Sequence, residues 1–246
     1  MSGHSKWSTI KHKKGALDAK RGRIFTRLIK EITVAARMGG GNAEGNPRLR
    51  AAVAEAKSNN MPADNIKRAI QKGTGELPGV AYEEKTYEGY GPGGAAVLIN
   101  TVTDNANRTT SELRHLLGKH GGNLGEANSV AWIFERKGYI IVPKQGAQED
   151  RLLEIILDAG GEDLKDDGES YEIFSPPEAF EAVRKALETS QVPFNLAEIS
   201  MIPQNSVRLE GKKAQQILTL MEALEDHDDV QKVFSNFDVD DSEIQE

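Results

Sequence analysis

Positively charged side chains are concentrated in the first eighty residues, and phosphate binding is the chemistry that such a concentration serves. Residues 1–80 contain 16 Lys or Arg and six Asp or Glu, a net charge of +10, whereas the rest of the chain carries −17. Each Lys or Arg that neutralises a phosphate of a nucleic acid releases a counterion, which favours binding. The charge segregation therefore predicts that this region meets a polyanion, although the whole chain has a net charge of −7.

The candidate contact residues lie in a basic N-terminal arm and on two predicted helices. Residues 14–27 contain five Lys or Arg and a single acid, Asp18, so ion pairs between residues four apart do not balance the charge. A solvated helix face is the alternative, and we favour contact with nucleic acid. Trp7 is interpreted equally well as a base-stacking residue or as an anchor for the arm. The predicted contact residues are Lys6, Trp7, Lys11, His12, Lys13, Lys14, Lys20, Arg21, Arg23, Arg27, Lys30, Lys67 and Arg68.

The sequence has no arrangement that is typical of an enzyme or a metal centre. The five histidines are scattered, and no zinc-protease helix motif, P-loop or nucleophile elbow occurs. The acidic C-terminal end lacks the spacing of a calcium loop, and the absence of cysteine excludes disulfides and thiolate ligands. We therefore predict that the protein is not an enzyme, with no catalytic residues, no metal and no cofactor.

Residues 89–94 contain the letters of a dinucleotide-binding loop, G-x-G-x-x-G. Such a loop lies between a strand and a helix, so that the phosphate meets the helix N-terminus. Here residues 95–102 alternate like a strand, and a proline interrupts the loop. We interpret the segment as a hairpin turn.

Three helices are predicted to position the cations. Residues 17–38 have the apolar period of an amphipathic helix, and three glycines end it. A second helix begins at Asn46-Pro47, a capping residue followed by proline, and runs to about residue 57. A third begins at Pro62 and ends at Gly73, and the three make a small helical domain. The second and third also have the appearance of a helix-turn-helix, although any helical hairpin does. Its groove-facing residues would be Asn65, Lys67, Arg68 and Lys72.

Beyond a glycine- and proline-containing linker, the pattern changes to strands alternating with helices. Strands are predicted at 84–90, 95–102 and 130–136, and a helix at 108–120. The next elements follow the order β-α-β-β-α-β, which is the ferredoxin-like plan. They are predicted at 139–143, 149–159, 162–165, 170–174, 177–189 and 196–202, followed by a strand near residue 207, a helix at 212–224 and a strand at 230–237.

These elements predict an α+β protein with an N-terminal three-helix domain followed by two ferredoxin-like α/β domains, one inserted in the other. The predicted boundaries are 1–80 for the helical domain, 81–137 with 204–246 for the first α/β domain, and 138–203 for the inserted one. No apolar stretch is long enough to span a membrane, and the N-terminus lacks the apolar core of a secretion signal. We therefore expect a cytoplasmic protein with no membrane partner.

Seven short blocks lie along nearly the whole chain, at residues 3–7, 18–22, 46–50, 58–62, 87–94, 105–109 and 121–124. In these blocks the sequence resembles the YebC/PmpR family. The resemblance implies a helical N-terminal domain with two α/β domains and a role as a DNA-binding transcriptional regulator. Mitochondrial members are translational activators, and bacterial relatives are linked to translation through proline-rich stretches.

Two functional hypotheses follow from the charge and the resemblance. The first is a regulator that binds duplex DNA, and the second is a ribosome-associated translation factor that binds ribosomal or transfer RNA, including at proline-rich stalls. Exposed strand edges also leave a homodimer open.

Overall fold

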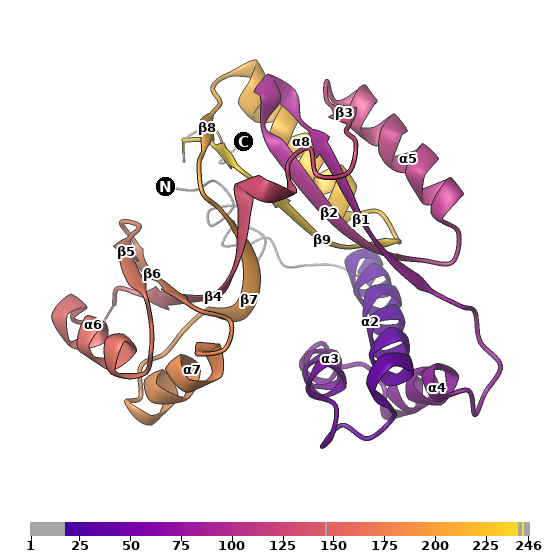
Figure 1. The fold of residues 1–246 in the computed structure, drawn as a ribbon, viewed down its shortest axis with the longest axis horizontal. Helices are drawn as coiled ribbons and strands as arrows, with labels where there is room; N and C mark the ends of the chain where they lie inside the picture. The colour runs from indigo at the N-terminus through magenta and orange to yellow at the C-terminus, as the bar shows by residue number, and fades with distance from the viewer. Residues whose placement is uncertain (1–17, 146, 241–242, 244–246) are drawn as a thin grey trace. The chain divides into compact units, whose positions relative to one another are not determined.

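The computed structural model describes residues 18–145, 147–240 and 243, with side chains from residue 22 onward. Two compact units are present. Residues 132–206 form the inserted unit, and the described residues on either side of it form the larger unit (Figure 1). No helix of the described residues is long and apolar enough to cross a membrane.

The larger unit begins with three packed helices, α2 (Asp18–Gly39), α3 (Pro47–Ser58) and α4 (Ala63–Thr74). As predicted, Asn46 caps α3, because its Oδ1 accepts a hydrogen bond from the Leu49 backbone N–H at 3.1 Å. Helices α2 and α4 approach closely at Gly73, where a Cβ atom would lie 2.4 Å from the Thr33 carbonyl oxygen. The shared core includes Ile32, Ala35, Leu49, Ala52, Ala56 and Ile66.

A four-stranded antiparallel sheet forms the rest of the larger unit. Its strands are β1 (Glu83–Tyr90), β2 (Ala96–Thr103), β3 (Asn123–Leu124) and β9 (Val230–Ser235), in the order β3-β1-β2-β9. Helices α5 (Ala106–Lys119) and α8 (Lys212–Glu225) pack on one face of it, against side chains such as Ile99. A short parallel pair, β8 (Val207–Arg208) with β10 (Phe237–Asp238), completes the unit.

The glycine-rich segment at 89–94 is a hairpin turn, which confirms the sequence interpretation. Tyr90 pairs with Ala96 across β1 and β2, and the short 3-10 helix η1 (Pro92–Gly94) lies between the strands. Gly93 has a φ of 72°, a conformation that favours glycine. At Gly91 a Cβ atom would lie 2.6 Å from Ile217 of α8, so this glycine allows α8 to pack against the turn.

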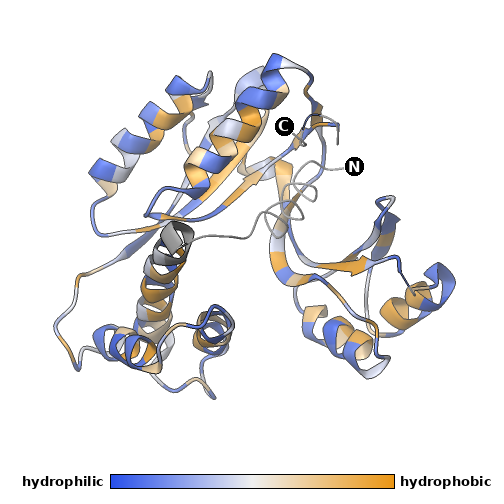
Figure 2. Ribbon diagram, turned by 180° about the vertical axis from the view of Figure 1, so that it is seen from behind, coloured by the Kyte–Doolittle hydropathy of each residue, from blue (hydrophilic) through white to orange (hydrophobic). Residues whose placement is uncertain are grey.

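The inserted unit has the ferredoxin-like strand order. Its antiparallel sheet runs β5-β6-β4-β7, and α6 and α7 pack on one face against Ile140, Ile173 and their neighbours. Hydrophobic residues are concentrated on strands such as β2, whereas β1 is hydrophilic and the helices have hydrophobic and hydrophilic sides (Figure 2). The elements are η2 (Ala131–Ile133), β4 (Phe134–Pro143), α6 (Glu149–Asp158), β5 (Asp163–Asp166), β6 (Ser170–Ser175), α7 (Phe180–Thr189) and β7 (Leu196–Pro203).

The predicted α+β class is confirmed, and two details differ from the prediction. Both α/β domains were predicted to be ferredoxin-like. The first sheet instead opens with a direct β1–β2 hairpin, so the full β-α-β-β-α-β order belongs to the inserted unit alone. The predicted strands at 130–136 and 139–143 are one strand, β4, which begins at Phe134 after η2. Gly138 lies inside this strand. Its missing side chain makes room for packing, because a Cβ atom there would lie 2.2 Å from the Ser175 Oγ.

Candidate nucleic-acid interface

The outer face of α4 carries more cations than acids, because Asp64 is the one acid of this helix. Lys67, Arg68 and Lys72 are exposed, and they lie on the side of the helix opposite the buried Ile66 and Ala69. Within the described part of the chain, none of these three cations takes part in an ion pair. Such side chains can reach the phosphates of a nucleic acid without first giving up another partner.

Two other cations of the helical domain are engaged within the protein. Arg48 on α3 contacts Glu31 through Nε and Glu84 through Nη2, both at 2.6 Å. Arg37 near the end of α2 donates from Nη2 to the Tyr82 carbonyl oxygen. These contacts connect the helices to each other and to the start of the sheet, so their charges serve the fold.

A row of three cations on α2 faces the turn that joins α8 to β9. Spacings of four and three residues place Arg23, Arg27 and Lys30 on one side of the helix. Arg23 Nη1 lies 3.2 Å from Asp226 Oδ2, and Arg27 Nη1 donates to the Glu225 carbonyl oxygen at 3.3 Å.

Lys30, the last cation of this row, binds the far end of the same turn. Its Nζ donates to the Asp228 carbonyl oxygen at 2.9 Å and to Asp229 Oδ1 at 2.6 Å. We call Arg23, Arg27 and Lys30 the α2 cation row, and residues 225–229 the acidic turn.

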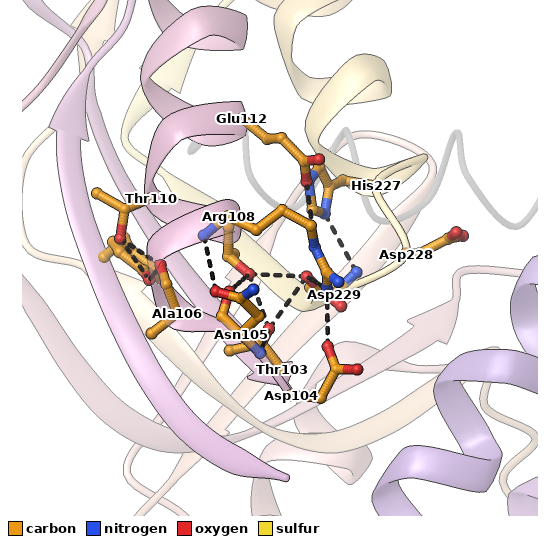
Figure 3. A network of polar contacts seen from close by, with 12 residues as sticks. Thr103, Asp104, Asn105, Ala106, Arg108, Thr110, Glu112, His227, Asp228 and Asp229 are labelled. Carbon is orange, nitrogen blue, oxygen red and sulfur yellow. Dashed lines mark hydrogen bonds and ion pairs between the residues drawn. The ribbon is translucent and has the colours of Figure 1, made fainter. Parts of the chain in front are cut away.

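The carboxylate of Asp229 is the centre of a buried polar network (Figure 3). Its residue is 2% exposed. Besides the Lys30 ammonium, its second oxygen accepts hydrogen bonds from Arg108 Nη2 at 2.7 Å and Thr109 Oγ1 at 2.7 Å, and from Thr103 Oγ1 at 3.2 Å. Burial alone would raise the pKa of Asp229, but the hydrogen bonds from Lys30, Arg108 and Thr109 outweigh it and hold the pKa well below its usual range. The carboxylate is therefore charged, and it joins α2, α5 and β9.

The predicted contact residues fall into three groups. Lys67 and Arg68 are exposed, as a phosphate contact requires. Arg23 and Arg27 are half-buried, and Lys30 is 7% exposed. The prediction for Lys30 assumed an accessible ammonium, and the structure corrects this, because Lys30 is enclosed and holds Asp229. The others lie outside the described residues (Lys6, Trp7, Lys11, His12, Lys13 and Lys14) or on the first turn of α2, where only the backbone is described (Lys20 and Arg21).

Beside the network lies an open hollow of about 1060 Å³, and Glu112, His227 and Asp229 approach one another there closely enough to suggest a metal site. His227 Nδ1 accepts a hydrogen bond from the Asp229 backbone N–H at 3.1 Å. The ring proton is therefore on Nε2, which lies 2.8 Å from Glu112 Oε2 and donates to it. Both ring nitrogens and both Asp229 oxygens have partners, so the group is satisfied by hydrogen bonds and does not offer a free set of metal ligands.

Sequence reasoning missed Asp229 and Arg108, because their partners are distant in the chain. Asp229 and Lys30 are 199 residues apart, and no spacing rule relates them. One signal for Lys30 was available. The residues that follow it, 32–36, are Ile-Thr-Val-Ala-Ala with no charge, and a helix that is apolar on all sides is enclosed by other elements.

Comparison with known proteins gives the chain its family. A model described as the TACO1/YebC protein N-terminal domain matches residues 5–76, and one described as the TACO1/YebC second and third domain matches residues 82–237. The chain belongs to the TACO1/YebC family. All of the predicted contact residues fall within the first of these two matches.

Relatives of this TACO1/YebC chain are similar over their whole length. A probable transcriptional regulatory protein of Koribacter versatilis is 61% identical over 246 residues, which are 100% of this chain and 99% of that protein. One of Geobacter sulfurreducens is 58% identical over 245 residues, with the same coverage. The crystal structure of a conserved hypothetical protein from Aquifex aeolicus has 49% identity and a TM-score of 0.83, covering 96% of this chain and 98% of that one. These relatives make the chain a member of a regulator family, and their names do not describe an enzyme.

Proposed function

We propose that the protein is a non-enzymatic regulator of gene expression that binds duplex DNA through its helical domain. The observation that carries this proposal is the outer face of α4, where Lys67, Arg68 and Lys72 are exposed, take part in no ion pair among the described residues and outnumber the single acid of the helix, Asp64. The net charge of +10 over residues 1–80 and the names of the relatives as transcriptional regulatory proteins support it.

The contacts proposed for α4 are of the kind that positions a protein on a nucleic acid. Ammonium and guanidinium groups bind phosphate oxygens, and phosphates carry no sequence information. We therefore propose that α4 supplies affinity for the backbone, while Asn65, half-buried on the same helix, is the candidate for a base contact. Binding through α4 then depends strongly on salt and weakly on sequence.

A triple substitution tests this role. Lys67→Gln, Arg68→Gln and Lys72→Gln together remove three charges from α4. A control variant with Arg136→Gln, Arg151→Gln and Lys185→Gln removes the same charge from exposed positions of the inserted unit. Affinity for a fluorescent 20-base-pair duplex is measured by anisotropy between 50 and 300 mM KCl.

We expect the α4 variant to bind about tenfold more weakly or worse at 100 mM salt, because each lost phosphate contact removes about 0.9 from the slope of log affinity against log salt. The control should retain the slope of the wild-type protein. Equal losses in the two variants would show that only net charge matters and that α4 is not the contact surface.

A ribosome-associated translation factor is the second candidate function. Phosphates of ribosomal or transfer RNA would suit the same α4 cations. The two side-chain amides of α4, Asn65 and Gln71, are both half-buried, which favours a partner recognised by its backbone. Cosedimentation with ribosomes, beside footprinting on promoter fragments, separates the two. Crosslinks to ribosomal RNA together with DNA binding that is blind to sequence would favour translation, whereas a sharp, competitor-resistant footprint would favour transcription.

A further inference from the structure

The contacts between the α2 cation row and the acidic turn change in character along the helix. At the inner end, the side chains of Lys30 and Asp229 are 9% and 2% exposed. At the outer end, the side chains of Arg23 and Asp226 are 37% and 42% exposed. One row of cations therefore has a closed end and an open end.

The inner end is fixed. Asp229 accepts hydrogen bonds from α2 and α5 at once, and separating Lys30 from it would leave a charge enclosed without a partner. Removing one partner of a buried ion pair is strongly unfavourable, so no outside ligand displaces Asp229. The inner contact keeps α2 against the sheet while the outer end exchanges partners.

The outer end is exchangeable. Arg23 Nη1 lies 3.2 Å from Asp226 Oδ2, and both groups are in contact with solvent. Exposed ion pairs of this kind contribute little to stability and are screened by salt. Arg27 is bound to a backbone carbonyl oxygen, and this contact does not balance its charge.

We propose that the Asp226 carboxylate stands in for a nucleic-acid phosphate on Arg23, and that a bound backbone displaces it. A guanidinium group binds carboxylate and phosphate with the same fork of N–H donors, so the exchange needs no change in Arg23 itself. The outer end of the α2 cation row is then a second phosphate-contact surface in addition to α4, and in the free protein the acidic turn covers it. This inference rests on the function proposed above.

Two single substitutions in the acidic turn test the exchange. Asp226→Asn removes the carboxylate that faces Arg23. Asp228→Asn removes the same charge two residues away, from an exposed side chain that has no ion pair in the described part of the chain (Figure 3). Both variants are compared on the fluorescent duplex, with and without Arg23→Gln.

We expect Asp226→Asn to tighten binding about two- to fivefold beyond Asp228→Asn, which is the range of an exposed ion pair. In the Arg23→Gln background, the two aspartate variants should bind equally, because the group that Asp226 covers is gone. Arg23→Gln alone should lower the slope of log affinity against log salt by about 0.9.

Equal affinities of Asp226→Asn and Asp228→Asn with Arg23 present would overturn the exchange. If the wild-type protein then still bound the duplex through α4, the proposed function would stand alone. If neither the wild-type protein nor Asp226→Asn bound nucleic acid, both proposals would fall. Binding by Asp226→Asn but not by the wild-type protein would support both, with Asp226 as the group that blocks the surface.

Discussion

Replacing Asp229 by asparagine removes the central charge of the buried network while keeping its shape. The carboxylate accepts four side-chain hydrogen bonds, from Lys30, Arg108, Thr109 and Thr103. Arg108 is 43% exposed and also contacts Asp104, so solvent and that carboxylate can balance its charge. The Lys30 side chain is 9% exposed and would lose its counter-charge. Since breaking a buried pair costs about 3–5 kcal/mol, and only one of the two cations is enclosed, we expect a loss near 3 kcal/mol.

Urea unfolding followed by circular dichroism measures this loss. A change of about 3 kcal/mol moves the midpoint by about 1–2 M for an ordinary urea dependence. Adding Lys30→Met to Asp229→Asn should recover most of the stability, because apolar replacement of a buried pair is often neutral. Asp228→Asn is the matched control and should change stability by less than about 0.5 kcal/mol. If Asp229→Asn behaved like this control, Lys30 would have access to water and the network would not be closed.

Three further predictions follow from contacts of the same kind. The pKa of Asp229 in the folded protein lies below its unfolded value of about 3.9, so the carboxylate stabilises the fold above that pH and stops doing so as the pH falls. The difference in the free energy of unfolding between the wild-type protein and Asp229→Asn should therefore become smaller below about pH 4. Glu88 is 8% exposed and accepts backbone N–H bonds from residues 128, 130 and 131, each at 2.7 Å, so Glu88→Gln should cost about 1–3 kcal/mol in urea unfolding while the exposed Glu83→Gln costs little. Gly138→Ala should destabilise the protein by about 1–3 kcal/mol, because the added Cβ atom overpacks the site. At Gly22 a Cβ atom would have no neighbour within 4 Å, so Gly22→Ala should stabilise α2 by about 0.5–1 kcal/mol. Thermal unfolding should show a lower melting temperature for the first variant and a higher one for the second.

Local chemistry explains why the helices and the hairpin could be predicted from the sequence. The Asn46-Pro47 start of α3 depends on a cap and a proline within one turn, and both are visible in the sequence. The turn at 89–94 requires glycines at positions that the alternation of the flanking strands identifies. By contrast, Gly138 has the appearance of a break between two strands, and only the approach of Ser175 and Phe180 shows that it lies within one.

The candidate interface was predicted less completely, because burial is a property of the folded chain. Lys30 and Lys67 are both lysines on amphipathic helices, and apart from the uncharged residues 32–36 their sequence surroundings do not separate an enclosed side chain from an exposed one. The difference is that Lys30 meets Asp229 from the other end of the chain, whereas the outer side of Lys67 on α4 meets no element of the described part of the protein.

The excess of basic charge in residues 1–80 therefore has two causes, and a count of charges does not distinguish them. Part of the basic charge of the helical domain is the complement of the acidic turn, and Lys30 would be needed there even in a protein that never met a polyanion. The cations of α4 have a single acid, Asp64, on their own helix and take part in no ion pair among the described residues, and no contact in the described part of the chain accounts for three of them on one exposed face. Under the function proposed above, these cations bind a phosphate backbone, and the outer end of the α2 cation row adds to that surface only when the backbone displaces Asp226 from Arg23. The substitutions described above separate the two kinds of surface. Removing charge from α4 should weaken duplex binding directly, whereas removing Asp226 should strengthen duplex binding only while Arg23 is present.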